Sequence, residues 1–147
     1  MFLKPYQKPF KCFQRVRKED VQVDGEKFTI NILRGLKKHK KGKSRPLVLF
    51  CFAVDNLASL KNLPFWLRQS KENVVPGHFP FWIVAMKEDL RKSFPDHIVQ
   101  EKDLRAVVNE MHPRGYLKCS ARDGEGVDNL FDSAVRFLND AEHAGYK

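Results

Sequence analysis

The chain has 147 residues, of which 42% are apolar and 31% charged, and its net charge is +9. This length and composition predict one folded domain and exclude a disordered or low-complexity chain. The longest apolar run, residues 47–54, is too short to cross a bilayer, and residues 1–11 lack the apolar stretch of a secretory signal. Three widely spaced cysteines indicate neither a disulfide framework nor a zinc site, and they favour a reducing compartment.

The positive charge is concentrated near the N-terminus. Residues 1–45 hold 14 Lys and Arg against 4 Asp and Glu, whereas residues 46–147 have a net charge of −1. The densest run, residues 34–45, is predicted to be an exposed basic loop because like charges repel one another. The alternative is a surface that contacts anions on a membrane or an acidic protein, through Lys37, Lys38, Lys40, Lys41, Lys43 and Arg45. No aromatic residue interrupts these lysines, which disfavours nucleic acid as the partner.

The first predicted elements are strands. Residues 1–20 are expected to form an irregular, basic N-terminus. Asp24-Gly25 predicts a tight turn between strands at 21–23 and 28–33, because both residue types tolerate a positive φ. Residues 47–54 are apolar on both faces of an extended chain, which predicts a central strand buried on both sides.

Strands and helices then alternate along the chain. The apolar spacing predicts helices over 58–69, 98–111 and 126–138, with Pro64 compatible only with a first helical turn. Short apolar runs predict strands over 79–85 and 116–119. This alternation predicts an α/β fold with a parallel sheet.

Gly42-Lys43-Ser44 matches only the end of the phosphate-binding pattern G-x-x-x-x-G-K-[ST]. Lys37 occupies the position of the first glycine, and Pro46 leads into a strand where the pattern needs a helix. The segment is therefore not predicted to be a P-loop. No catalytic residue and no metal site are predicted either, because the histidines show no ligand spacing and the hydrolase motifs G-x-S-x-G and H-E-x-x-H do not occur.

Two stretches follow predicted parallel strands, at the edge where open α/β sheets bind ligands. The first is residues 84–91 and the second is residues 116–122. The carboxylate of Asp89 can accept N–H groups from a guanine edge, and the stem of Lys87 can cover the face of a base. The backbone N–H of Ala121 can donate to a base carbonyl.

Taken in order, these stretches resemble the Rho family of small GTPases in the Ras superfamily. Lys87-x-Asp89-Leu90-Arg91 is similar to the family's base-specificity motif N-K-x-D-L-R, and Cys119-Ser120-Ala121 is similar to its C-S-A loop. Val23-Asp24-Gly25-Glu26, residues 49–55 and Trp66 also match the family's order, so the resemblance covers about residues 21–138 of a single domain, 1–147. It implies a Ras-like, P-loop-NTPase-type, mostly parallel sheet flanked by helices. It also implies base contacts from Lys87, Asp89, Ser120 and Ala121.

The departures from the family concern the phosphate and metal contacts. Nothing before Val21 matches the family's first strand and P-loop, Leu33-Arg34-Gly35-Leu36 stands where D-x-x-G is expected, and Met86 replaces the motif's asparagine. We therefore expect a pseudo-GTPase that binds effector or regulator proteins, with weak or no GTP or GDP binding, no magnesium and no hydrolysis. The alternatives are a genuine guanine-nucleotide-binding Rho GTPase seen as a fragment, and a basic module that docks on an anionic membrane or nucleic acid. The C-terminus is no prenylation box, so the expected location is the cytoplasm, with peripheral membrane attachment as the alternative.

The missing first strand also affects the expected sheet, because that strand lies between the third and fourth strands in the family. We therefore expect either that residues 28–33 pair directly with residues 47–54, or that the segment around residues 10–13 fills the gap. In both arrangements residues 47–54 should be buried on both faces, and residues 37–43 should be exposed.

Overall fold

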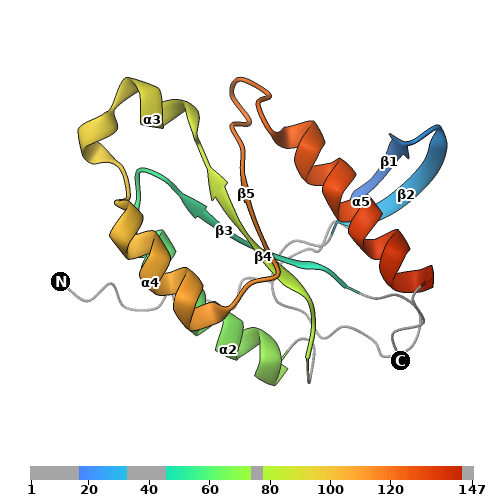
Figure 1. The fold of residues 1–147 in the computed structure, drawn as a ribbon, viewed down its shortest axis with the longest axis horizontal. Helices are drawn as coiled ribbons and strands as arrows, with labels where there is room; N and C mark the ends of the chain where they lie inside the picture. The colour runs from blue at the N-terminus through green and yellow to red at the C-terminus, as the bar shows by residue number, and fades with distance from the viewer. Residues whose placement is uncertain (1–16, 33–45, 74–77, 144–147) are drawn as a thin grey trace.

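The computed structural model describes residues 17–32, 46–73 and 78–143 (Figure 1). The elements in chain order are β1 (Arg17–Val23), β2 (Glu26–Ile32), β3 (Val48–Ala53), α1 (Leu57–Lys61), α2 (Leu63–Asn73), β4 (Phe81–Met86), α3 (Asp89–Ser93), the 3-10 helix η1 (Pro95–His97), α4 (Glu101–Met111), β5 (Gly115–Lys118) and α5 (Val127–His143). The alternation of strands and helices from β3 onward confirms the predicted α/β fold.

The predicted hairpin is present as β1 and β2. Asp24 and Gly25 form its turn with φ values of 53° and 82°, which is the left-handed conformation that this residue pair favours. The antiparallel ladder extends from Val23 opposite Glu26 to Arg17 opposite Ile32. The first strand therefore begins four residues earlier than predicted, since cross-strand pairing continues through its charged residues.

The three remaining strands form a parallel sheet in the order β3-β4-β5. One face of this sheet packs against α1, α2 and α4, and its core includes Phe52, Leu60, Ile83 and Val107. The other face carries α5, whose Phe137 ring meets Trp82 of β4 edge to face at 5.5 Å. The two helical layers lie on opposite sides of the sheet in Figure 1.

The prediction that residues 47–54 are buried on both faces is wrong. Phe50 and Phe52 are buried at 6% and 2% exposure, but Leu49 is 37% exposed and Cys51 is also exposed. Side chains alternate along a strand, so Leu49 and Cys51 share the α5 face of the sheet. Among the described strands, β3 is the outermost of its sheet, so α5 covers its neighbour β4 more fully than it covers β3.

The prediction that the hairpin pairs directly with β3 is also wrong, because β1 and β2 form a separate two-stranded sheet. The hairpin packs against α5 instead (Figure 1). At this contact Nη2 of Arg136 donates to Oδ1 of Asp24 at 2.8 Å, and Val23 is buried. The alternative placement of residues 10–13 in the gap, and the exposure of residues 37–43, lie outside the described residues.

The helices differ from prediction mainly at their ends. The segment predicted as one helix is divided at Asn62, and Pro64 lies in the first turn of α2, where its missing N–H does no harm. α5 continues to His143 instead of ending at Leu138. The short α3 and η1 were not predicted from the apolar spacing. Among the described helices, none is long and apolar enough to cross a membrane.

Candidate functional site at the carboxyl edge of the sheet

The predicted base-contact residues lie together at the carboxyl edge of the parallel sheet. β3, β4 and β5 end at Ala53, Met86 and Lys118. Parallel strands bring their carboxyl ends to one edge, so the loops that follow β4 and β5 are adjacent. The N–H of Glu88 in the first loop donates to the carbonyl oxygen of Cys119 in the second at 3.2 Å.

A hydrogen bond between side chains joins the two loops. Oγ of Ser120 donates to Oδ1 of Asp89 at 2.7 Å, although the two residues are 31 positions apart. Ser120 is fully buried, and its Oγ also accepts the N–H of Asp123 at 3.3 Å. The serine hydroxyl therefore orients the Asp89 carboxylate and holds its own loop at the same time.

The backbone of the second loop is held by Ser120 and Gly126. The N–H of Ser120 donates to the carbonyl oxygen of Glu125 at 2.8 Å, which closes the loop. Gly126 has a φ of +76°, and a Cβ at this position would lie 2.3 Å from the carbonyl oxygen of Lys118. Only glycine fits such an approach, so Gly126 allows the chain to turn from β5 into α5. Ala121 lies in the same turn and is exposed.

Lys87 also lies at this edge, but its side chain contacts a residue that the sequence analysis did not single out. Its Nζ is 3.2 Å from Oδ2 and 3.3 Å from Oδ1 of Asp55, which follows β3. Both side chains are partly exposed, and Lys87 has a φ of 63°. Asp55 could have been found from the sequence, because it directly follows the apolar run 47–54 and so marks the carboxyl end of that strand.

Met86 occupies the position of the family's asparagine and contacts a cysteine. Sγ of Cys119 lies 3.4 Å from Sδ of Met86. Burial, and to a lesser degree the charge of Glu88, raise the pKa of the Cys119 thiol, so the thiol stays protonated and is not a nucleophile at neutral pH. Glu88 in turn accepts two hydrogen bonds from Arg91, at 2.9 and 3.1 Å. This fork raises the pKa of Arg91.

Tyr116 of β5 lines a smaller hollow beside the site. The hollow has a volume of about 250 Å³ and lies between α4 and β5. The Tyr116 hydroxyl is buried and has no hydrogen-bond partner in the part of the chain that the structure describes. Burial, assisted by the charge of Glu88, raises the pKa of Tyr116 to about 12.

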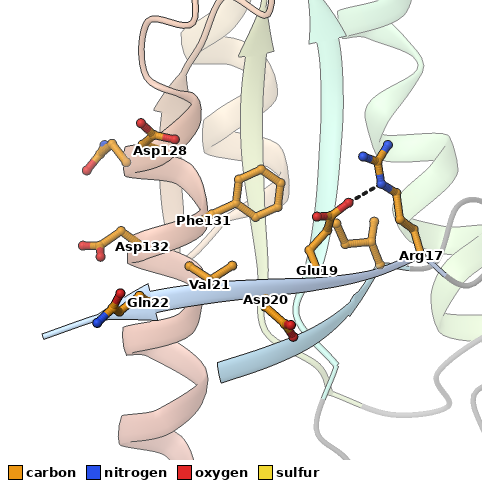
Figure 2. A pocket seen from close by; sticks show the side chains of 10 residues that line it. Arg17, Glu19, Asp20, Val21, Gln22, Asp128, Phe131 and Asp132 are labelled. Carbon is orange, nitrogen blue, oxygen red and sulfur yellow. Dashed lines mark hydrogen bonds and ion pairs between the residues drawn. The ribbon is translucent and has the colours of Figure 1, made fainter. Parts of the chain in front are cut away.

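A larger groove lies elsewhere, between β1 and α5 (Figure 2). Its volume is about 960 Å³, and the side chains of Val21 and Phe131 line it together with several carboxylates. Arg17 also lines it and forms an ion pair with Glu19. None of the four predicted base contacts lines this groove, so it is not the site that the sequence indicates.

The other predicted contacts cannot be compared with the structure. The anion-contact candidates Lys37, Lys38, Lys40, Lys41, Lys43 and Arg45 lie outside the described residues. Within residues 17–32, 46–73 and 78–143, no three His, Cys, Asp or Glu side chains are grouped in a way that could hold a metal ion.

Comparison with known proteins identifies the family. The model of the Ras family matches residues 16–140. The chain is 31% identical over 140 residues to the Rho-related GTP-binding protein RhoB of Homo sapiens and of Mus musculus, and the alignment covers 80% of this chain and 67% of each relative. It is 30% identical to the GTP-binding protein RHO2 of Saccharomyces cerevisiae, with the same coverage. The chain therefore belongs to the Ras family of small GTPases and is similar to its Rho-related members.

Proposed function

We propose that this chain is a Rho-like protein-binding module that keeps a guanine-base site, binds GDP or GTP weakly and hydrolyses neither. The observation that carries the proposal is the 2.7 Å hydrogen bond from Ser120 to Asp89 at the carboxyl edge of the sheet. It orients a carboxylate at the place where open α/β folds bind ligands.

The residues at this edge have chemistry that suits a guanine. The carboxylate of Asp89 can accept the two N–H groups of the guanine edge, and the exposed backbone of Ala121 can donate to the base carbonyl. The aliphatic stem of Lys87 can cover the face of the base once its Nζ leaves Asp55. The exposed ion pair between Lys87 and Asp55 opposes this movement only weakly, because exposed pairs contribute about 0–1 kcal/mol.

Weak binding and absent hydrolysis are proposed because of the residues that replace the family's phosphate contacts. Phosphoryl transfer needs a phosphate cradle, a metal and a positioned water. Lys37 stands where the P-loop has its first glycine, and Leu33-Arg34-Gly35-Leu36 stands where the family has D-x-x-G. Contacts to the base alone leave most of a nucleotide's charge uncompensated, so its binding should depend little on magnesium.

Calorimetric titration with GDP and with GTP, each with and without magnesium, tests the proposal. We expect micromolar or weaker affinity that Asp89→Ala lowers by about tenfold or more, because hydrogen bonds to a charged group contribute about 1.5–3 kcal/mol. Asp96→Ala, which removes an exposed aspartate from η1, is the matched control and should change nothing.

Two results would contradict the proposal. Nanomolar GDP affinity with an absolute magnesium requirement would show a genuine nucleotide-binding GTPase. Release of phosphate from GTP that Lys43→Ala abolishes would show that Gly42-Lys43-Ser44 acts as a P-loop after all.

The proposed protein partners of this chain are effector or regulator proteins. The support is the similarity to Rho-related GTP-binding proteins over 80% of the chain. Pull-down of the purified chain with Rho-regulator domains tests for such partners. Asp89→Ala, which should weaken nucleotide binding, should still be retained if the partner binds without a nucleotide.

A further inference from the structure

One edge of the parallel sheet carries backbone groups that no described strand pairs. Among the described residues, the carbonyl oxygen of Leu49 meets only the thiol of Cys51 in its own strand, with Sγ at 4.0 Å. The N–H groups of Val48 and Val54 donate to carbonyl oxygens of the β4 segment at 3.1 Å each. Hydrogen bonding alternates along a strand, so the odd-numbered residues of β3 direct their N–H and C=O groups away from β4. These residues are Leu49, Cys51 and Ala53. They face the outer edge, along which no described strand pairs.

The end of this edge nearest the candidate site is closed. The N–H of Ala53 donates to Oγ of Ser59 at 3.0 Å, and its carbonyl oxygen accepts the N–H of Asn56 at 3.0 Å. The open stretch is therefore Leu49 to Cys51, near the middle of β3.

Within the described residues, this stretch lacks the lysine, proline and bulge that commonly protect an exposed edge. Such edges usually carry lysine, proline or a bulge, whereas β3 has neither a charged residue nor a proline and pairs with β4 without a bulge. The side chain of Leu49 is 37% exposed, and Cys51 is exposed as well. The edge therefore combines backbone groups that no described strand pairs with accessible side chains.

We propose that a second copy of this chain pairs with it through this edge, in an antiparallel arrangement about a twofold axis at Phe50. Leu49 then lies opposite Cys51 of the second copy, and each such pair exchanges two backbone hydrogen bonds. Every outward N–H and C=O of the open stretch is used, because the edge is complementary to itself.

The distribution of charge is compatible with this partner. Residues 46–147, which include the whole parallel sheet, have a net charge of −1, so two copies of this part repel each other little. The excess of +10 lies in residues 1–45, and its repulsion is screened by salt. The dimer should therefore strengthen as salt is raised, unlike a complex held by ion pairs.

Sedimentation velocity of the full chain, kept reduced, tests the proposal. We expect a concentration-dependent species of twice the 17.1 kDa chain mass. Cys51→Lys should raise its dissociation constant by about tenfold or more, because a lysine at an exposed edge opposes strand pairing. Cys51→Ala keeps the neutral edge and should leave the dimer intact. Asn109→Lys, which adds the same charge on the exposed face of α4, should also leave it intact.

Amide hydrogen exchange followed by NMR examines the edge directly. The amides of Leu49 and Cys51 should exchange more slowly as the protein concentration rises. The amides of Phe50 and Phe52, which face β4, should be protected at every concentration and serve as internal controls. Protection of Leu49 and Cys51 that does not depend on concentration would show that the edge is covered within one chain and would overturn the proposal. A monomer at all concentrations, or a dimer that Cys51→Lys leaves unchanged, would overturn it as well.

Discussion

Ser120→Ala removes the hydroxyl that joins the two loops of the candidate site, and its effect on stability follows from the geometry. The hydroxyl is fully buried, donates to Asp89 at 2.7 Å and accepts the N–H of Asp123 at 3.3 Å. Substitution by alanine leaves both groups without this partner. We expect a loss of stability and, for any nucleotide that binds, a loss of affinity.

The magnitude depends on how well water replaces the hydroxyl. A hydrogen bond to a charged group contributes about 1.5–3 kcal/mol when its loss leaves the charged group unsatisfied. Asp89 is only half-buried, so water recovers part of this energy. We therefore expect the unfolding free energy to fall by about 1–2 kcal/mol, which lowers the melting temperature by about 2–8 °C in a chain of this size.

Urea unfolding of wild type, Ser120→Ala, Asp89→Ala and the double variant measures the effect and the coupling of the pair. Ser133→Ala, the same change on α5, where the hydroxyl lies 3.5 Å from Oδ1 of Asn129 and away from the site, is the control and should stay within about 0.5 kcal/mol of wild type. If Ser120→Ala is as stable as Ser133→Ala, or if the effects of Ser120→Ala and Asp89→Ala simply add, the two side chains do not act as a pair and the reasoning fails.

The remaining predictions concern the turn before α5 and the hollow beside the site. Gly126→Ala should lower the unfolding free energy by more than about 2 kcal/mol, because the new Cβ meets the Lys118 carbonyl oxygen. Gly124→Ala is the control, since Gly124 has a similar φ but open space around it. In the same urea assay it should lower the unfolding free energy by about 1–2 kcal/mol. Tyr116→Phe should leave the melting temperature unchanged or raise it, because it removes a buried hydroxyl that has no partner among the described residues. The difference in ultraviolet absorbance between the wild type and Tyr116→Phe reports the ionisation of Tyr116. Its midpoint should lie near pH 12, because the pKa of Tyr116 is raised from the ordinary value of 10. Folding favours the neutral phenol, so the wild type should lose stability relative to Tyr116→Phe between about pH 10 and 12.

The sequence predicted best those features that depend on local chemistry. Asp24-Gly25 indicates its turn because the two residue types tolerate the φ values that the turn adopts. β4 is an apolar run buried on both faces, as expected for the centre of a parallel sheet. The family motifs and the rule that parallel strands end at one edge predicted that the loops of Asp89 and Ser120 lie at the same edge of the sheet. The hydrogen bond between the two side chains was not predicted.

The failures concern features that depend on what lies beside an element. Residues 47–54 have the same apolar pattern as a central strand, but the pattern does not show whether a neighbouring strand or helix covers the second face. That is why Leu49 and Cys51 were expected to be buried. The contact between Lys87 and Asp55 joins residues 32 positions apart, and no local signal pairs them.

The packing of the β1–β2 hairpin on α5 has a consequence for local unfolding. A two-stranded hairpin alone is marginally stable in water, and within the described residues this one is not continuous with the parallel sheet. Its attachment includes the exposed pair between Asp24 and Arg136 and the buried Val23. The hairpin and the three-stranded sheet should therefore behave as two cooperative units. The hairpin should open first, at a free energy well below that of global unfolding, and its amides should exchange while β4 remains intact.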